Sequence, residues 1–277
     1  MSIAAISKID QGECMRIIQT NPANRLLAEL DPEDFDPIGS QLRSVTLQRG
    51  AILQEQGSFV DTVYFPLNSI VSMVTTMSSG STAETVMIGR EGAVGMFPAL
   101  GRRRAFARAI VQTPGAALSM PAAQIQEAAL CSEPFKQLIL RYKEYLMAQV
   151  IQTAACNALH SVEARLARRM LQMNDRAEGA PITETHVMMS QMLGARRTTV
   201  TLLAGKFQDH GIIRYRRGRI SIIDRRRLEA SACECYGIMR GQSHDMYGKL
   251  ECLATMNAPP APVHIQHRTT DERPRAT

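Results

Sequence analysis

The sequence predicts an α+β protein: an antiparallel β domain comes first, a long helix follows, and a winged helix-turn-helix domain comes last. Three observations support this prediction. Short β-rich runs alternate with glycine turns from residue 44 to residue 121. A continuous helical pattern then extends from Glu133 to about His160. Finally, two short helical patterns and two alternating strands occupy Ile182 to Ile223.

We place segment boundaries where these patterns change. Two short helices, Arg25–Leu30 and Glu33–Leu42, are expected before the first strand. The last residues are rich in proline with mixed charge, which is typical of disorder. The predicted segments are a flexible leader (1–23), the β domain (24–131), a dimerisation helix (132–160), the winged helix-turn-helix (161–231), a C-terminal helix (232–253) and a disordered tail (254–277).

Strands in the β domain are predicted from short runs of β-branched and aromatic residues. Turn residues, glycine above all, separate these runs at nearly regular intervals, which favours an antiparallel barrel or sandwich. The predicted strands are Val45–Leu47, Ala51–Leu53, Val63–Phe65, Ile70–Met77, Thr85–Ile88 and Ala109–Gln112.

The long helix has a heptad-like pattern. Ser132 precedes it as a predicted cap. One stripe alternates spacings of four and three, which favours a dimer seam; packing on the chain's own β domain is the alternative. The stripe consists of Leu138, Tyr142, Tyr145, Gln149, Gln152, Cys156 and Leu159.

The helix-turn-helix is predicted from its turn and from the apolar spacing on either side. Thr183 is the expected cap of the first helix, with Glu184 in its first turn. Gly194 supplies the left-handed residue that the tight turn requires. Buried positions recur every three or four residues, as one helix face requires. They are Leu166, Met170, Leu171 and Met173 in the preceding helix, then Met189, Met192, Leu193, Val200 and Leu203.

The opposite face of the second helix carries the candidate DNA contacts. Residues at the start of a recognition helix reach base edges in the major groove. Arg197 is the candidate for a bidentate contact to guanine, and Thr198 and Leu202 are candidates for a thymine methyl. Hydroxyls and guanidiniums also position a protein on phosphates. The phosphate candidates on this helix are Arg196, Thr199 and Thr201.

An arginine-rich hairpin follows the recognition helix. The strands Ile212–Tyr215 and Arg219–Ile223 alternate in polarity, and the tip lies at Arg217-Gly218. Arg216, Arg217 and Arg219 gather positive charge there, which suits a wing that lies along the DNA backbone. Solubility alone is the other interpretation of such a hairpin.

Positive charge is concentrated in the C-terminal part of the chain. Residues 161–231 hold 14 Lys and Arg against 7 Asp and Glu, whereas the whole chain has a net charge of +6, so the remainder is close to neutral. This asymmetry indicates a polyanionic partner for the C-terminal segment; a solvated basic face is the alternative.

Composition and motifs exclude several other classes. We find no apolar run of about 18 residues and no secretory signal, so we expect a cytoplasmic protein with no membrane partner. The six cysteines are too sparse for a disulfide framework. Zincin, phosphate-loop and nucleophile-elbow motifs are missing, so we expect neither an enzyme nor a cofactor.

From about Asn24 to Ser231 the chain resembles the Crp–Fnr family of bacterial transcription regulators. In the β domain the resemblance rests on Gly89–Gly95 (GREGAVG) and on the strand-and-glycine pattern before it. In the C-terminal domain it rests on Met192–Val200 (MLGARRTTV), the more specific match. The resemblance implies a β-roll like that of cyclic-nucleotide-binding domains, serving as a sensor. It implies double-stranded DNA and a second copy of the chain as partners, with RNA polymerase a candidate third.

The chain departs from the family where cyclic AMP would bind. Members that bind cyclic AMP carry glutamate after a glycine of the phosphate loop, whereas Gly95 is followed by Met96. Their Arg-Ser-Ala run corresponds to Ala105–Ala107, without an aligned arginine, although residues 102–104 and 108 are arginines. We expect a degenerate ligand pocket near Gly95, Met96 and Ala107, no high-affinity cyclic-AMP binding, and an effector that the sequence does not identify.

The cysteines do not follow a metal-binding pattern. Iron–sulfur members of the family cluster cysteines near the N-terminus, where this chain has only Cys14. Cys233, Cys235, His244 and Cys252 include zinc-ligand residue types, but their spacing is not that of a zinc knuckle or ribbon. We expect buried or idle thiols and no metal site, and the sequence leaves the roles of Cys233 and Cys235 open.

The predicted function is sequence-specific DNA binding by a homodimeric transcription regulator of the Crp–Fnr type. The site would be near-palindromic, with two recognition helices in successive major grooves. The alternative is a ligand- or redox-sensing module that signals through a protein or RNA partner, with the basic segment as its contact surface.

Overall fold

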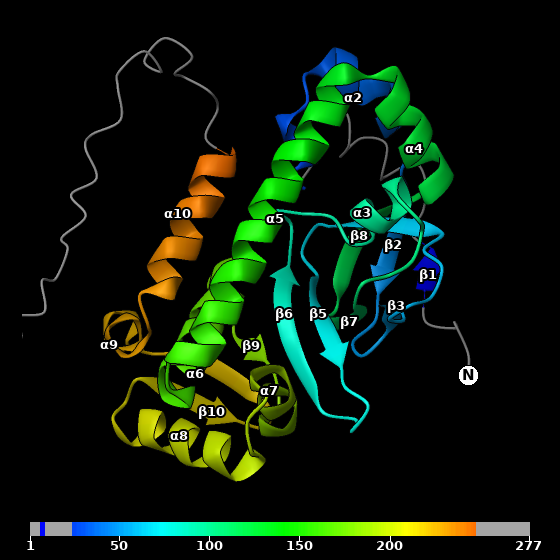
Figure 1. Ribbon diagram of the computed structural model, residues 1–277. Coiled ribbons are helices and arrows are strands. Elements are labelled where there is room, and N and C mark those ends of the chain that lie inside the picture. Colours follow the sequence, from blue (N-terminus) through cyan, green and yellow to red (C-terminus); the bar gives the residue numbers. More distant parts are fainter. Residues whose placement is uncertain (1–5, 9–23, 248–277) are drawn as a thin grey trace, which may run out of the picture. The chain divides into compact units, whose positions relative to one another are not determined.

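The computed structural model describes residues 6–8 and 24–247 (Figure 1). In this part of the chain two antiparallel four-stranded sheets come first. Short runs of β-formers separated by tight turns fold the chain back on itself repeatedly. The strands are β1 (Ile6–Lys8), β2 (Arg43–Leu47), β3 (Ile52–Gln54), β4 (Thr62–Pro66), β5 (Ile70–Thr76), β6 (Thr82–Ile88), β7 (Arg108–Thr113) and β8 (Gly115–Pro121).

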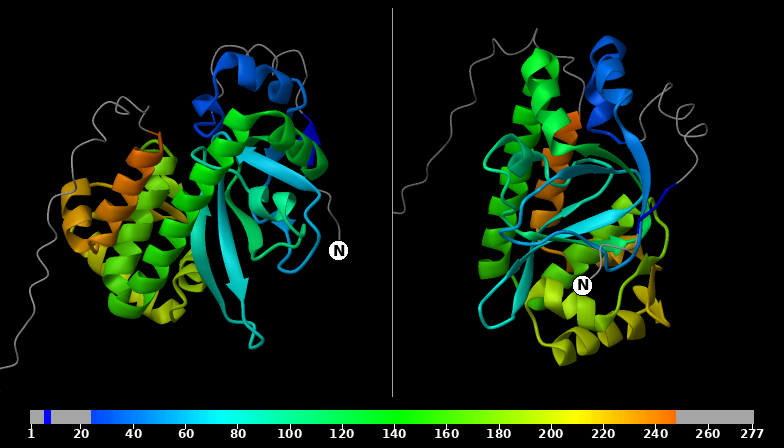
Figure 2. Two further views of the ribbon diagram at one scale, coloured as in Figure 1. Left: turned by 45° about the horizontal axis from the view of Figure 1, so that its top comes forward. Right: turned by 90° about the vertical axis from the view of Figure 1, so that its right-hand side faces the viewer.

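The two sheets have the strand orders β1-β2-β8-β4 and β3-β7-β5-β6. Figure 2 shows the β domain from two further directions. Every pairing in them is antiparallel. Leu47, Tyr64, Val71 and Val111 belong to one buried cluster formed by strands of both sheets. The predicted antiparallel β domain is therefore confirmed.

Strand β8 is central to its sheet, although the sequence pattern did not predict it. Its residues pair with β2 on one side and β4 on the other. The segment begins at Gly115 and is rich in small residues, so it looks like a continuation of the Pro114-Gly115 turn. A Cβ on Gly115 would lie 2.4 Å from Oδ1 of Asn68, so a larger residue could not occupy this position without displacing its neighbours.

The residues before β2 differ from the prediction in three places. Ile6–Lys8, within the predicted flexible leader, form β1 and pair with β2, so that assignment is wrong there; residues 9–23 lie outside the described part. The helix predicted at 25–30 is only a 3-10 turn, η1 (Leu27–Glu29), since Asp31-Pro32 soon interrupts it. The next helix, α2 (Pro32–Gly39), ends before Leu42.

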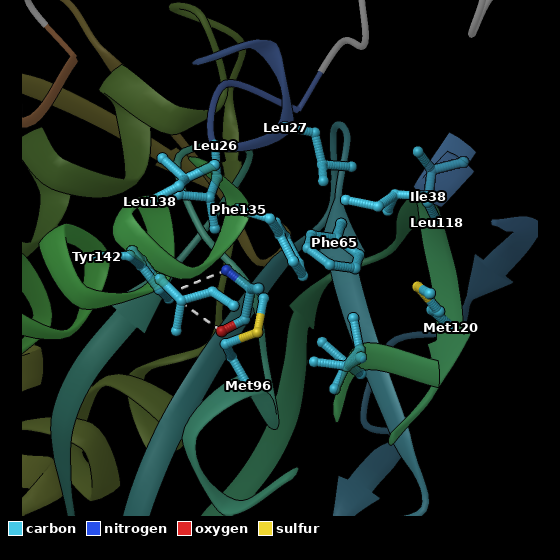
Figure 3. Close-up of a cluster of buried hydrophobic side chains, with 14 of the residues drawn as sticks. Leu26, Leu27, Ile38, Phe65, Met96, Leu118, Met120, Phe135, Leu138 and Tyr142 are labelled. Atoms are coloured by element: carbon cyan, nitrogen blue, oxygen red, sulfur yellow. Dashed lines mark hydrogen bonds between the residues drawn. The ribbon is translucent and has the colours of Figure 1, made fainter. Parts of the chain in front are cut away.

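A second cluster joins the β domain to the helices that cover it. Figure 3 shows Leu26, Phe65, Phe135 and Tyr142 among its labelled side chains. The Tyr142 hydroxyl accepts the Ala93 N–H at 2.9 Å and donates to the Ala93 carbonyl at 3.1 Å. Because both bonds of the hydroxyl are made, this large side chain is fully buried without leaving a polar atom unpaired. Helix α2 contributes to this cluster, together with α3 (Met96–Leu100), α4 (Ala122–Cys131) and α5 (Glu133–Leu159). Met246 and Tyr247, at the end of the described residues, also belong to it.

The long helix forms as predicted, but its predicted dimer seam does not. Ser132 caps α5 by accepting the Phe135 N–H at 3.2 Å. Leu138 and Tyr142 are buried against the chain's own β domain, and Cys156 is buried among residues that follow the winged domain. Among the seven seam residues Leu159 is exposed and Gln152 is half-buried. Heptad spacing identifies an apolar stripe but not the surface that covers it. Here residues of the same chain cover the stripe.

The opposite face of α5 is exposed and mostly apolar, with the exposed Glu144 between Leu140 and Met147. Leu140, Met147 and Ile151 are 45%, 53% and 61% exposed, and Ala154 and Ala158 are exposed as well. These positions repeat at spacings of three, four and seven, the pattern of a helix–helix seam. This face is available to a second molecule.

The C-terminal segment contains the helix predicted before the helix-turn-helix, and one helix more than predicted, because two helices stand where a single C-terminal helix was expected. Helix α6 (Val162–Arg176) precedes the helix-turn-helix, and α9 (Arg225–Ser231) and α10 (Cys235–Tyr247) follow it. The predicted helix over 232–253 is wrong at its start, because residues 232–234 separate α9 from α10; residues 248–253 lie outside the described part. Helix α10 runs beside α5, and Gln149 donates to the Met239 carbonyl at 3.2 Å (Figure 1). Among the described helices, none combines the length and apolarity needed to cross a membrane.

Candidate nucleic-acid interface

Helices α7 (His186–Leu193) and α8 (Arg197–Asp209) form the predicted helix-turn-helix. Gly194 ends α7 with φ +59°, a left-handed conformation that glycine adopts without a Cβ clash. The next N–H, that of Ala195, donates to the Ser190 carbonyl at 2.9 Å. Only residues 194–196 therefore separate the two helices, and the predicted role of Gly194 is confirmed.

The start of α7 differs from the prediction. Thr185, not Thr183, is its cap, and the Thr185 hydroxyl accepts the N–H three residues later at 3.2 Å. Thr183 belongs to β9 (Ile182–Thr183), the third strand of the wing sheet. Glu184 is not a solvated first-turn residue: it is buried and pairs with Arg169 at 2.7 Å. Either threonine suits a cap, and strand pairing decides between them.

A buried side of this unit determines which residues point outward. Val200 and Phe207 of α8 pack in one cluster with Met189 of α7 and Leu166 of α6. Leu203 is half-buried against the same cluster. These positions lie on one side of α8 because their spacing is three or four residues.

Exposed residues occupy the other side of α8. Leu202 is 74% exposed on this side of the helix. The sequence-predicted residues of this face lie together as expected: Arg196, Arg197, Thr198, Thr201 and Leu202 are exposed, and Thr199 is half-buried.

The wing is a two-stranded hairpin, β10 (Ile213–Arg216) and β11 (Arg219–Ile222), with β9 added at its edge. Arg217 and Gly218 form its two-residue tip, with φ values of +51° and +76°. Two left-handed residues in succession are the signature of the tight turn that suits the twist of a hairpin. Arg216, Arg217 and Arg219 are all exposed at or beside this tip.

His186 links the two helices to the wing, a role that sequence reasoning missed. Its Nδ1 lies 3.0 Å from Oγ1 of Thr201, and its ring stacks on Tyr215 with centroids 4.3 Å apart. Partial burial, and then the nearby Arg197 charge, lower the pKa of His186. The neutral ring therefore positions Thr201 beside the wing at neutral pH.

Buried ion pairs connect this domain to the β domain. Arg169 of α6 pairs with Glu84 of β6 and also with Glu184, just before α7. Arg176, at the end of α6, pairs with Glu91 at 2.7 Å. Burial raises the pKa of Glu184, while the Arg169 charge opposes that rise. The guanidinium of Arg169 thus lies between the β domain and the entry to the helix-turn-helix.

The residues predicted around a ligand pocket lie close together but are tightly packed. The Met96 side chain is buried in the core. Gln54 lies between the other two, donating to the Ala107 carbonyl at 3.1 Å. Its Oε1 would be 3.4 Å, and Val60 3.0 Å, from a Cβ placed on Gly95. A side chain at position 95 would therefore crowd Val60, and the Ala107 carbonyl is already bonded by Gln54.

Two of the four nearby arginines are also engaged. Arg108 pairs with Glu55 at 2.6 Å. Arg104 donates to the Gly57 carbonyl at 3.0 Å and covers the Phe59 ring. These contacts hold both guanidiniums against the β domain.

Cys233 and Cys235, for which the sequence predicted no partners, lie in a cluster. In the described part of the chain they gather with Cys156 and His160 from the end of α5. His244 is not in this group, and Cys252 lies outside the described residues. Sequence spacing gave no sign of this grouping, because it joins positions more than seventy residues apart.

Two family profiles match the chain. One, described as a cyclic nucleotide-binding domain, matches residues 44–130. The other, described as a Crp-like helix-turn-helix domain, matches residues 164–231. The first covers the β domain and the second covers α6 to α9. No curated protein sequence matches the chain.

Solved structures share the fold at low identity. FixK2 from Bradyrhizobium japonicum has a TM-score of 0.61 at 13% identity, covering 69% of this chain and 98% of its own. A Crp/Fnr-family regulator from Eubacterium rectale has a TM-score of 0.59 at 17% identity, covering 74% and 96%. The c-di-GMP-responsive regulator CLP from Xanthomonas campestris has a TM-score of 0.58 at 13% identity, covering 69% and 99%.

Proposed function

This chain belongs to the Crp–Fnr family, and from that premise we propose that it is a transcription regulator that binds a near-palindromic DNA site as a homodimer. The observation that carries the proposal is the exposed side of α8, where arginine and threonine side chains face solvent beside an arginine-rich wing. This surface lies in the segment that holds all of the chain's surplus positive charge.

The first turn of α8 is the proposed base-reading element. Arg197 is its first residue and is exposed, so its guanidinium can make a bidentate contact to guanine O6 and N7. Leu202 and Thr198 offer methyl groups to thymine. In the complex the exposed side chain of Leu202 would become buried against DNA. Arg196, Thr199 and Thr201 are left to position the helix on phosphates.

The wing is the proposed backbone contact. Arg216, Arg217 and Arg219 stand at the hairpin tip, and guanidiniums there neutralise phosphates without reading sequence. The stack of His186 on Tyr215 supports this arrangement, because it fixes the wing relative to α8. Both elements would then engage one stretch of duplex together.

The proposed dimer interface is the exposed apolar face of α5, in place of the seam that the sequence suggested. Leu140, Met147 and Ile151 form a stripe on the side of the helix that faces away from the chain's own core. Two such helices packed along this stripe bury apolar surface that water otherwise contacts. A two-fold axis there presents two copies of α8 to successive major grooves, about one helical turn apart.

We also propose that cyclic AMP is not the effector. Gly95 is followed by the buried Met96, and Gln54 and Val60 close the space beside it. The guanidiniums of Arg104 and Arg108 are held by protein groups. Calorimetric titration with cyclic AMP should give no binding heat, and micromolar affinity would overturn this part of the proposal.

Selection of binding sites from random duplex DNA tests the function. The full chain should enrich a near-palindromic sequence, since an exposed recognition face on each subunit reads one half-site. Failure to enrich any sequence would contradict the proposal and favour the alternative, a sensing module whose basic segment contacts RNA or a protein. Arg197→Ala serves as the matched protein control and should lose enrichment at specific positions.

A further inference from the structure

Four metal-ligand side chains converge at the end of the long helix. Cys156 and His160 lie in the last turn of α5 and just after it, while Cys233 and Cys235 lie between α9 and α10 and at the start of α10. One ligand atom from each lies within 4.8 Å of all the others. The three cysteines are buried and His160 is half-buried.

The separations within this cluster suit a single metal ion. The Sγ atoms of Cys156 and Cys233 are 3.4 Å apart, and the Cys235 Sγ lies 3.6 Å from Nδ1 of His160. In a tetrahedral site with zinc–sulfur bonds of about 2.3 Å and zinc–nitrogen bonds of about 2.0 Å, neighbouring ligands are roughly 3.5–3.8 Å apart. We propose that Cys156, His160, Cys233 and Cys235 bind one Zn²⁺ as a structural Cys₃His site.

The surroundings of His160 support this assignment. Its Nε2 lies 3.1 Å from the carboxylate of Glu234. A carboxylate that accepts the Nε2 proton leaves a lone pair on Nδ1, the nitrogen that lies 3.6 Å from the Cys235 sulfur. Histidines that bind metals are usually oriented in this way, by a carboxylate on the other ring nitrogen. If the thiols bind no metal, the contact between His160 and Glu234 orients no ligand.

Two further polar groups suit thiolates better than thiols. Gln152 donates its side-chain N–H to the Cys235 sulfur at 3.0 Å. Arg168 is only 7% exposed, and its Nε has no hydrogen-bond partner among the described residues. Three thiolates around Zn²⁺ carry a net charge of −1, and a buried guanidinium nearby balances it.

Without a metal, Cys156 and Cys233 are buried, protonated thiols. Burial raises the pKa of Cys156 to about 12 and also raises the pKa of Cys233, while the Arg168 charge lowers both. Binding of Zn²⁺ releases these protons, because the ligand form is the thiolate. The bond between the metal and the sulfurs then replaces weak S–H contacts.

A disulfide between Cys156 and Cys233 is the competing interpretation of their 3.4 Å separation. The disulfide would account for the position of two of the four clustered residues. It would give no role to Cys235, to His160 or to the contact of His160 with Glu234. A tetrahedral ion uses all of them, so the metal is the better account.

The site has a clear mechanical consequence. It fastens the end of α5, whose outer face is the proposed dimer interface, to the segment that follows the winged domain. Bound zinc should therefore hold α10 against α5 and steady the junction at Ser161, where α6 begins. Because the ion binds the folded chain alone, its removal should lower the melting temperature.

The test is metal analysis of the full chain, purified with reductant and without chelator. It should contain one zinc ion per chain by mass spectrometry of the metals. Apoprotein refilled with Co²⁺ should show thiolate charge-transfer and tetrahedral ligand-field bands. Cys156→Ser, Cys233→Ser and His160→Ala should each lose the metal. Cys131→Ser is the matched control and should retain the metal, because this exposed cysteine ends α4 and lies outside the cluster.

A second variant separates ligation from folding. His160→Cys offers a fourth thiolate and should keep zinc, whereas His160→Ala should not; a purely structural histidine would not show this pattern. Chain that folds but holds no zinc and gives no Co²⁺ bands would overturn the proposal. So would a Cys156–Cys233 disulfide in the metal-free chain, found by mapping peptides without reduction.

Discussion

At the scale of single residues, Arg197 and Arg217 have different proposed tasks on the same DNA. Arg197 begins the recognition helix, where a planar guanidinium can match two acceptors on one guanine. Arg217 stands at the wing tip with φ +51°, where it can reach a phosphate. The first contact carries sequence information, and the second does not.

Arg197→Ala should weaken binding to the selected site by about 1–3 kcal/mol and relax specificity at one position of each half-site. The reason is that alanine removes both hydrogen bonds to the base. Fluorescence anisotropy with the selected duplex and its single-base variants measures this. Arg240→Ala removes the same charge from α10, outside the proposed interface, and should have little effect. Equal effects of the two substitutions would contradict base reading by Arg197.

Arg217→Gly should weaken binding to all duplexes alike and reduce the salt dependence by roughly one released ion per subunit. Glycine is the informative replacement, because it removes the charge and also suits the left-handed backbone at this position. Affinity measured across a salt series gives the slope. An unchanged slope would mean that Arg217 does not contact a phosphate.

Local spacing predicted which residues of α8 are exposed, because a helix face repeats every three to four residues. It could not choose between Thr183 and Thr185 as the cap, since β9 takes the first of them. Nor could it place His186 between Thr201 and Tyr215. Those contacts depend on how the wing returns to the helices, which no local pattern encodes.

At the scale of elements, α5 has two apolar faces with different uses. Tyr142 and Tyr145 lie on the face that packs into the chain's own core. Met147 and Ile151 lie on the face exposed to solvent. The first stripe is clearer in the sequence because its residues are larger. Its heptad spacing therefore predicted a dimer seam, whereas the stripe packs against the same chain.

Ile151→Glu should convert a dimer into a monomer, because it places a charge in the middle of the exposed stripe of α5. Sedimentation equilibrium measures the change, and the melting of the β domain should be little affected. Leu130→Glu places the same charge at an exposed leucine of α4, away from the stripe, and should leave the dimer intact. A variant Ile151→Glu that remains dimeric would exclude this face as the interface.

Strong local signals predicted most elements, and the exceptions have physical causes. Strand β8 follows a proline and is built of small residues, so its identity depends on the two strands that pair with it. The break between α9 and α10 contains Cys233, whose environment is set by α5. Tertiary contacts decide both cases.

At the scale of the whole molecule, buried ion pairs connect the β domain to the DNA-binding domain. Arg169 is surrounded by Glu84 from one domain and Glu184 from the entry to the other. A buried pair adds little stability over an apolar replacement, but breaking it leaves a buried charge unpaired. The ion pairs therefore contribute more to the relative orientation of the two domains than to the stability of the fold.

Arg169→Met should lower the free energy of unfolding by about 3–5 kcal/mol, since it leaves two buried carboxylates without a cation. Urea denaturation measures the change. Arg90→Ala breaks the exposed Arg90–Glu178 pair between the same two domains and should cost less than about 1 kcal/mol. Similar losses in the two variants would show that Arg169 is not the buried link.

Clusters of side chains from positions far apart in the sequence were the least predictable part of the molecule. The order of domains followed from composition and periodicity, and the surplus charge indicated which domain meets DNA. The cluster of Cys156, His160, Cys233 and Cys235 did not follow, because two helices far apart in the chain must meet before its spacing exists.

In the proposed complex two recognition helices, fixed by one dimer axis, read one face of the duplex. The most direct test is to insert five base pairs, about half a helical turn, between the half-sites of the selected sequence. Affinity should fall towards that for random DNA, because one half-site then faces away from its helix. Unchanged affinity for the lengthened site would contradict reading by two helices on one dimer axis.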